Sequence, residues 1–356
     1  MDELDELIDF LSDKRPQIKL HAVELVQGLT GSPEGIAHLS GRSATLLPAL
    51  FRLVGDEQAS RGAMVSLVNL SQEPSVQQQL LSLSAPSRCM DYIRERTCPH
   101  NDLLVMLLAN LTSLEEGAAA LLQLGKGALE GLHLAMLLKL FLGPVLPGQP
   151  DPYAHVATIL PNVTRFREGR RLLLQPGRGL LPALASQLRS RDELRRRGCA
   201  GAIKNCCFSC EEDGTLEQIL GEEAALDDVL QVLCGTGSRP DDTSSSSPAG
   251  STSAALPAAG DNSDAAVREA LAEAVLCLTR TQPGRKKLWQ LQAPVLLQKG
   301  YEYEEHPGIM AVMEATAEIF LEDGLAPGAG GDGDASGEQQ QGQQGNGRLV
   351  QIDELD

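Results

Sequence analysis

Aromatic side chains are scarce in this chain, since they make up 3% of its 356 residues and include one tryptophan. Leu and Ala dominate the apolar content instead. These residues combine high helix propensity with small or medium volume, which suits short helices that pack closely. The chain also lacks a long segment of alternating apolar and polar residues, which is the pattern typical of a strand. We therefore predict an all-α protein.

The sequence contains none of the common catalytic motifs. It has no G-x-S-x-G elbow, no G-x-x-x-x-G-K-[ST] phosphate loop, no G-x-G-x-x-G after a strand, and no H-E-x-x-H pair. Its six histidines are scattered and have no obvious acid or base partners nearby. We therefore expect a protein that is not an enzyme, with no catalytic residues and no cofactor.

The chain also lacks long apolar runs and an excess of positive charge. It opens with the acidic stretch MDELDELIDF, which resembles neither a signal peptide nor a transit peptide. No apolar run approaches the roughly 20 residues that span a bilayer. The formal net charge of −18 repels a phosphate backbone. We expect a cytoplasmic monomer, with the nucleus as an additional location, that binds neither membranes nor nucleic acid.

What the chain does contain is one sequence motif that occurs six times. A helical run ends in Asn-Leu-Ser or a variant, a short polar break follows, and a second apolar run begins. The clearest copies are residues 64–81, 105–122 and 157–174, and the others are 22–39, 201–220 and 273–291. A unit of this kind cannot bury its own apolar face, so neighbouring units must stack and share one core.

The spacing of the copies identifies the type of repeat. Aligning Gly28, Asn69, Asn110, Asn162, Asn205 and Cys277 gives steps of 41, 41, 52, 43 and 72 residues. These steps are close to the period of armadillo and HEAT repeats. The step of 52 contains the Gly and Pro stretch 143–152, and the step of 72 contains a low-complexity insert. We predict a right-handed superhelical solenoid of about six to seven helical repeats.

Composition divides the chain into four parts. Armadillo-like repeats are expected at 1–237 and again at 264–324. Between them, the insert 238–263 is rich in Ser, Ala, Pro and Gly, and the tail 325–356 is acidic and rich in Gly and Gln. Segments so polar and so rich in glycine cannot bury enough apolar surface to fold, so we expect both to be disordered.

An asparagine recurs at one position of the repeat, late in the helix before the break: Asn69, Asn110, Asn162 and Asn205. Asparagine is a poor residue for a helix interior, so its recurrence needs a reason. One interpretation is that each side chain bonds backbone groups where the helix ends. The other is that the four amides line the inner face of the superhelix and bind the backbone of an extended peptide. The sequence leaves both open.

Positive charge is concentrated in one region. Residues 165–204 contain eleven Lys or Arg and only three acidic residues. The ordinary interpretation is a set of solvated helix faces paired with acidic residues of neighbouring repeats. The functional hypothesis is that Arg195, Arg196, Arg197 and Lys204 bind an acidic partner.

Cysteines cluster where other copies of the repeat carry aliphatic residues. Cys199, Cys206, Cys207 and Cys210 include one C-x-x-C, but a second pair is missing and no histidine lies among them. A buried cysteine behaves as a small apolar residue, which favours packing over a metal site. No metal is predicted, and an enzyme built on a metal at these cysteines is the alternative.

Two stretches carry a more specific resemblance. They are 197–208 (RGCAGAIKNCCF) and 266–285 (AVREALAEAVLCLTRTQPGR). Both resemble the HGH-one homolog family, whose members are armadillo-like cytosolic proteins, and the likeness extends from the first repeat to the helix near Ile319. The resemblance implies a chaperone adaptor that binds translation elongation factor two during folding, together with the TRiC chaperonin and the Hsp90 system.

A second hypothesis is a general armadillo scaffold that binds linear motifs in signalling or nuclear transport. Import adaptors pair their asparagines with repeated tryptophans to receive Lys-rich peptides. This chain has only Trp289, in the stretch after a break. That scarcity counts against nuclear import.

Overall fold

The computed structural model describes residues 2–145, 148–235 and 264–322, and within these ranges every regular element is a helix. The helices recur in sets of three: a helix that carries the recurring asparagine position near its end, a short helix after the break, and an outer helix. We call the first kind ladder helices. The predicted insert 238–263 and tail 325–356 lie outside the described ranges. The described helices fall within the two repeat regions expected from composition.

The ladder helices stack on one another in chain order. Each buries an apolar stripe, which is mostly Leu, Val and Ala in the earlier repeats, Ala, Ile and Cys in α14, and Ile, Met and Phe in α21. They are α2 (Pro16–Leu29), α5 (Ser60–Leu70), α8 (Asn101–Thr112), α11 (Val156–Val163), α14 (Glu193–Phe208), α18 (Ala265–Thr279) and α21 (Pro307–Glu322).

The short helices begin where the polar break ends. Proline at the first helical position starts two of them, α3 and α6, since its fixed φ suits that position and its missing N–H is not needed there. In α3 and α19, a side-chain hydroxyl accepts from a backbone N–H of the first turn. The short helices are α3 (Pro33–Ser40), α6 (Pro74–Ser82), α9 (Glu115–Leu122), α12 (Arg167–Leu173), α15 (Cys210–Asp213) with α16 (Leu216–Gly221), and α19 (Gln282–Gln290).

The remaining helices complete each repeat. The outer helices are α4 (Ser43–Leu53), α7 (Ala85–Glu95), α10 (Leu132–Phe141), α13 (Leu180–Ser186), α17 (Glu223–Cys234) and α20 (Ala293–Tyr301), and α1 (Glu3–Phe10) precedes the first ladder helix. Short 3-10 turns lie at Gly127–Leu129 and Gln187–Arg189. In the described residues, six sets thus follow one another, and α21 adds the ladder helix of a seventh.

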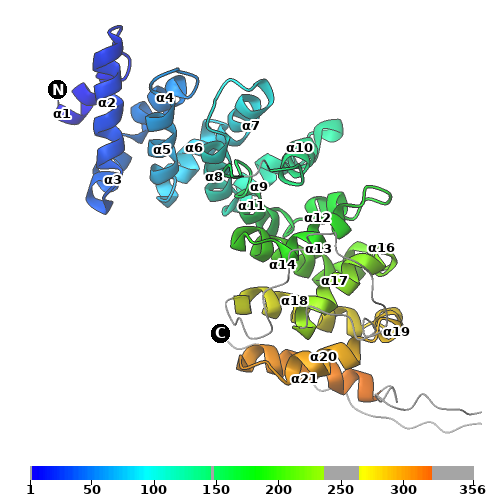
Figure 1. Ribbon diagram of the computed structural model, residues 1–356. Coiled ribbons are helices and arrows are strands. Elements are labelled where there is room, and N and C mark those ends of the chain that lie inside the picture. The colour runs from blue at the N-terminus through cyan, green and yellow to red at the C-terminus, as the bar shows by residue number, and fades with distance from the viewer. Residues whose placement is uncertain (1, 146–147, 236–263, 323–356) are drawn as a thin grey trace, which may run out of the picture.

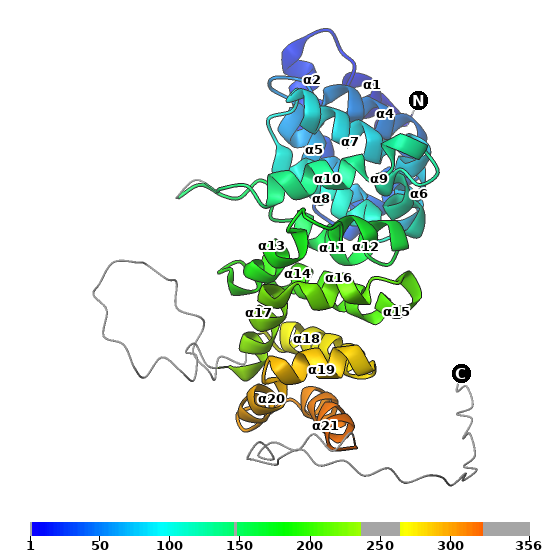
Figure 2. The ribbon, with the colours of Figure 1, turned by 90° about the vertical axis from the view of Figure 1, so that its right-hand side faces the viewer.

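The stack curves into an arc. Figure 1 shows the ladder helices α5, α8 and α14 towards its inner side, with α4, α7, α10, α16 and α19 on the outer side. In the rotated view of Figure 2, the repeats descend in order from α1 and α2 to α20 and α21. One continuous core of buried residues runs from Ile8 in α1 to Phe320 in α21. The predicted armadillo-like helical solenoid is confirmed.

Among the described helices, none combines the length and the apolar character that a membrane crossing requires.

Candidate functional site

The stacking of the ladder helices brings the four predicted asparagines into one line. Asn69 lies in α5, Asn110 in α8, Asn162 in α11 and Asn205 in α14, and each of these helices packs on the next. All four side chains are half-buried. Residues separated by about forty positions in the sequence therefore become neighbours along one surface of the arc.

Each asparagine uses its side-chain nitrogen to bind the preceding repeat. The Nδ2 group donates a hydrogen bond to a Ser or Thr hydroxyl at the end of the preceding ladder helix. The pairs are Asn69 with Thr30 (3.2 Å), Asn110 with Ser71 (2.9 Å), Asn162 with Thr112 (3.2 Å) and Asn205 with Thr164 (2.9 Å). In every pair the hydroxyl residue stands two positions after the asparagine position of its own repeat.

Two of the asparagines also reach the backbone of the preceding helix. Asn110 Nδ2 donates to the carbonyl of Val68 at 3.3 Å, and Asn205 Nδ2 donates to the carbonyl of Pro161 at 3.1 Å. A carbonyl can only accept, so these bonds fix which end of the amide points into the stack. The accepting hydroxyls are buried and donate their own hydrogens within their helices, as Ser71 does to Val68.

The opposite end of each amide has a different environment. In the described part of the chain, the Oδ1 atoms of the four asparagines accept no hydrogen bond, and none of them is a buried unsatisfied atom. Of the two interpretations drawn from the sequence, bonding within the fold thus concerns the Nδ2 atoms, and peptide binding concerns the Oδ1 atoms. Each Nδ2 atom donates its hydrogen bond to the neighbouring repeat rather than to the end of its own helix. The oxygen remains able to accept from a bound chain.

The line does not continue unchanged to the ends of the solenoid. Gly28 takes the position in α2, and Cys277 takes it in α18. Cys277 is half-buried, and burial raises its pKa against the opposing effect of the Arg280 charge. The candidate site therefore spans the central ladder helices, from α5 to α14.

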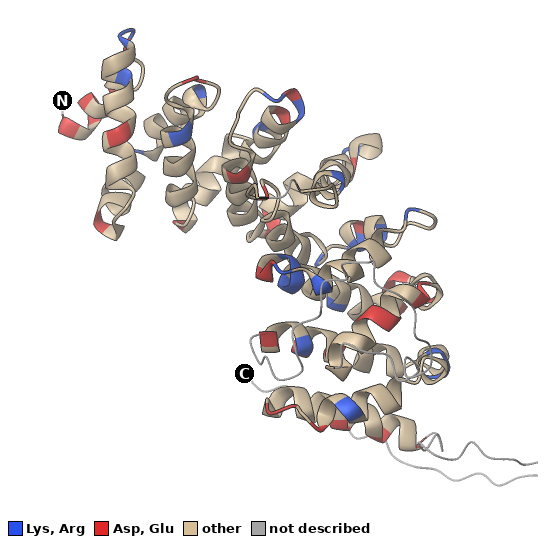
Figure 3. Cartoon of the chain, viewed as in Figure 1, with Lys and Arg blue, Asp and Glu red and all other residues tan. Residues whose placement is uncertain are grey.

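The predicted basic residues lie on α14, where Figure 3 shows cations gathered, but they face internal partners. Arg195 is 7% exposed, binds Asp151 at 2.6 Å, and stacks 4.1 Å from the ring centroid of Phe141. Arg196 binds Asp264 at 2.6 Å, Arg197 binds Glu193 and Asp264, and Lys204 pairs with Glu273.

These pairs limit what the basic residues can do outside the fold. The side chains of Arg195 and Arg196 are mostly buried, whereas those of Arg197 and Lys204 remain 49% and 38% exposed. Contact with an acidic partner stays a prediction, and Arg197 and Lys204 are the members that such a partner could reach.

The cysteine cluster is part of the packed core. Burial raises the pKa of Cys199 and Cys206 to about 12, that of Cys210 to about 11, and that of Cys207 well above its ordinary value. Thiols of this kind are protonated at neutral pH in the metal-free protein. Within residues 2–145, 148–235 and 264–322, no group of three or more His, Cys, Asp or Glu is placed to hold a metal ion.

One exposed aromatic residue was not singled out by the sequence reasoning. Phe208 is 72% exposed and lies three residues after Asn205, so it shares that side of α14. A large apolar side chain at this exposure is available to a partner. The signal was present in the sequence, because an apolar residue one turn beyond a surface asparagine must lie on the same face.

The stacked repeats and their line of polar side chains define a helical scaffold protein. Residues 92–245 match a family described as "Domain of unknown function (DUF383)". The chain is also similar to curated proteins named Protein HGH1 homolog. The relative from Dictyostelium discoideum is 24% identical, covering 91% of each chain, and the human relative is 29% identical, covering 90% of this chain and 82% of its own. The predicted resemblance to the HGH-one homolog family is confirmed.

The chain is also similar to solved structures. An engineered protein of known crystal structure is similar with a TM-score of 0.51 and 14% identity, covering 88% of this chain and 77% of its own. A designed armadillo repeat protein in complex with the peptide (KR)4 is 17% identical with a TM-score of 0.45, covering 90% of this chain and all of its own.

Proposed function

We propose that this protein is a non-enzymatic adaptor that holds an extended segment of a client protein along the asparagine line of α5, α8, α11 and α14. The observation that carries the proposal is the split use of each amide, with Nδ2 bound to the preceding repeat and Oδ1 left as an acceptor. Four acceptors at one per repeat can take hydrogen bonds from backbone N–H groups, which gives affinity with little sequence preference.

The resemblance to the HGH-one homolog family supports a more specific proposal. The client is translation elongation factor two during its folding, and the scaffold works in the cytoplasm with the TRiC chaperonin and the Hsp90 system. Trp289 supports this assignment over nuclear import, because it lies in the short helix α19 against Phe320 and not on a ladder helix. The asparagine line therefore has no tryptophans beside it within the described residues.

The asparagine line is tested by two matched double variants. Asn110→Ala with Asn162→Ala removes two acceptors and also three bonds between repeats. Ser71→Ala with Thr112→Ala removes the hydroxyl partners of two of these bonds, together with the bonds that the hydroxyls donate within their own helices, but leaves both asparagines in place. Each lost bond costs roughly 1 kcal/mol of unfolding free energy, so both proteins should be destabilised to a similar extent.

Client capture should separate the two proteins. We expect the asparagine variant to retain less client than the hydroxyl variant at a temperature where both are folded by circular dichroism. Equal losses of client in both would mean that the asparagines act only through stability, and the proposed binding role would be wrong.

The identity of the client is tested by affinity capture of the tagged full chain from cytosol at low and moderate salt. Recovery of elongation factor two together with chaperonin subunits is the expected result. Recovery of neither would contradict the adaptor proposal, while the asparagine variants would still report whether the line binds another chain.

A further inference from the structure

The last repeat leaves an apolar groove open at the end of the solenoid. Helices α17 and α18 are covered by α20 and α21, which pack on them from the following repeat. Between α20 and α21 themselves lies a groove of about 230 Å³ that no described residue fills. This groove is remote from the asparagine line of α5 to α14, so an inference about it goes beyond the proposed function.

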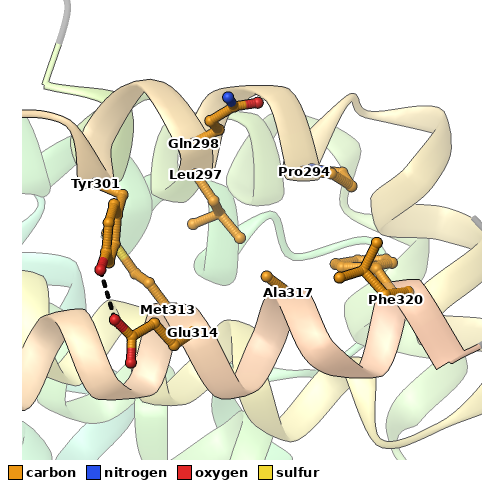
Figure 4. Close-up of a pocket in the computed structure, with 9 residues that line it drawn as sticks. Pro294, Leu297, Gln298, Tyr301, Met313, Glu314, Ala317 and Phe320 are labelled. Atoms are coloured by element: carbon orange, nitrogen blue, oxygen red, sulfur yellow. Dashed lines mark hydrogen bonds between the residues drawn. The ribbon is translucent and has the colours of Figure 1, made fainter. Parts of the chain in front are cut away.

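Two helical stripes form the walls of the groove. Leu297 and Tyr301 lie four residues apart on α20, and Met313, Ala317 and Phe320 follow at intervals of three or four on α21. Figure 4 shows Leu297 and Ala317 pointing towards each other at the middle of the groove, with Tyr301 at one end and Phe320 at the other. Parallel stripes of this spacing are the surface into which the apolar face of another helix packs.

The rim of the groove is acidic. On α21, Glu314 lines the groove and binds the hydroxyl of Tyr301, and Glu318 lies one turn further along the same side. Glu322 ends the helix, and the sequence of α21 contains no Lys or Arg. Figure 3 shows acidic residues along α21. The one cation of α20, Lys299, stands outside the stripe that faces the groove.

The acidic rim disfavours acidic occupants of the groove. A second copy docked through the same groove would place two rows of glutamates together, because a two-fold interface brings each patch onto itself. The tail of this chain is no better suited, since residues 323–356 carry seven Asp or Glu and a single Arg. Both candidates would repel the rim at low ionic strength.

We propose that the α20–α21 groove binds an amphipathic helix of a partner protein, with an apolar stripe flanked by Lys or Arg. The apolar stripe enters between Leu297 and Ala317, as the next repeat of a longer solenoid would. The flanking cations lie over Glu314 and Glu318. The partner thus extends the solenoid by one helix and supplies the positive charge that α21 lacks.

The fluorescence of Trp289, the single tryptophan, should change when a peptide occupies the groove. The ring centroid of Trp289 is 6.1 Å from that of Phe320, which lines the groove. The probe is an 18-residue amidated peptide of Leu and Lys with Leu at helical spacing. Two comparison peptides have Glu in place of Lys, or the same composition in scrambled order. Full-length protein is titrated with each peptide while Trp289 emission is recorded.

Matched variants on α21 locate the binding surface. Ala317 is exposed and lines the groove, whereas Ala311 is exposed but does not line it. We expect saturable binding of the Leu/Lys peptide that Ala317→Arg weakens at least about tenfold, and the neutral pair Ala317→Gln and Ala311→Gln should weaken it and leave it nearly unchanged, respectively. Glu314→Gln with Glu318→Gln should weaken binding at low salt and remove most of its salt dependence. Circular dichroism establishes that each variant is folded.

Several results would overturn the proposal. Equal binding of the Glu-containing or scrambled peptide would remove the charge argument, and full binding by Ala317→Arg would place the peptide elsewhere. Displacement of the probe by a synthetic peptide of residues 323–356 would identify the tail as the occupant. A dimer in sedimentation that Ala317→Arg dissociates would identify a second copy.

Discussion

At the scale of single residues, the recurring asparagine shows how one side chain can serve stability and binding with different atoms. The nitrogen of Asn110 reaches Ser71 and Val68 in the preceding repeat, and its oxygen accepts nothing within the described chain. The sequence predicted the position and its regular recurrence. It could not predict the direction of the amide, because the partner hydroxyl stands 39 residues away and becomes a neighbour only through stacking.

The cysteines give a residue-scale prediction. Of the eight, seven are buried and Cys277 is half-buried. We expect native protein to react with iodoacetamide first at Cys277 and only slowly elsewhere, because the other thiols are buried and inaccessible, and burial also raises the pKa of thiols such as Cys206 and Cys207. Mass spectrometry after timed labelling measures the order.

The raised pKa of Cys277 also predicts how its labelling rate changes with pH. Since burial raises the pKa of Cys277 above its ordinary value, its labelling should still be accelerating with pH above about 9. Protein labelled in urea provides the control, in which all eight thiols should react at similar rates. Rapid native labelling at Cys206 or Cys207 would contradict the packed cluster.

At the scale of helices, a glycine fixes how four of the short helices turn against the ladder helix before them. The third residue of α3, α9, α12 and α19 is glycine, and a Cβ atom there would lie 1.9 to 2.2 Å from a carbonyl oxygen near the end of the preceding ladder helix. The pairs are Gly35 with Leu29, Gly117 with Leu111, Gly169 with Val163, and Gly284 with Leu278. Only glycine allows so close an approach of two backbones.

This arrangement predicts opposite effects for two Gly→Ala substitutions. Gly117→Ala should lower the free energy of unfolding by at least about 1 to 3 kcal/mol, because backbone must move to admit the methyl group. Gly28→Ala should raise it by about 0.5 to 1 kcal/mol, because Gly28 lies inside α2 with open space around it and alanine is the better helix former.

Urea denaturation of both variants provides the measurement. Gly28→Ala serves as the control, since it makes the same chemical change in a helix without a close contact. A destabilised Gly28→Ala together with a neutral Gly117→Ala would contradict the described junction. The glycine at a fixed seven residues after the ladder position was visible in the sequence, but its tight contact depends on the angle between the two helices.

At the scale of the whole molecule, the solenoid is held together by contacts between neighbouring repeats. Ladder helices in the middle of the stack pack on a neighbour at each side, whereas α21 has a described ladder helix on one side only. Stability in such an array is nearly a sum of repeat and interface contributions, so the ends open more easily than the centre.

Hydrogen exchange should reveal this gradient. We expect the slowest amide exchange in α8, α11 and α14 and faster exchange in α1, α2 and α21, measured by mass spectrometry of peptic fragments. Equal protection in all helices would indicate a single cooperative unit. Adding the Leu/Lys peptide should slow exchange in α20 and α21 selectively if it occupies their groove.

The sequence by itself determined the helices, the period and the stacking of repeats, because apolar spacing and the polar breaks are local and recur every forty residues or so. Only the tertiary structure decided where side chains meet across repeats. In the fold, Arg195 is buried against Asp151, each asparagine nitrogen donates to a hydroxyl of the preceding repeat, and a groove lies between α20 and α21. These features depend on residues distant in sequence and on the angles at which helices pack, and the periodicity of a sequence specifies neither.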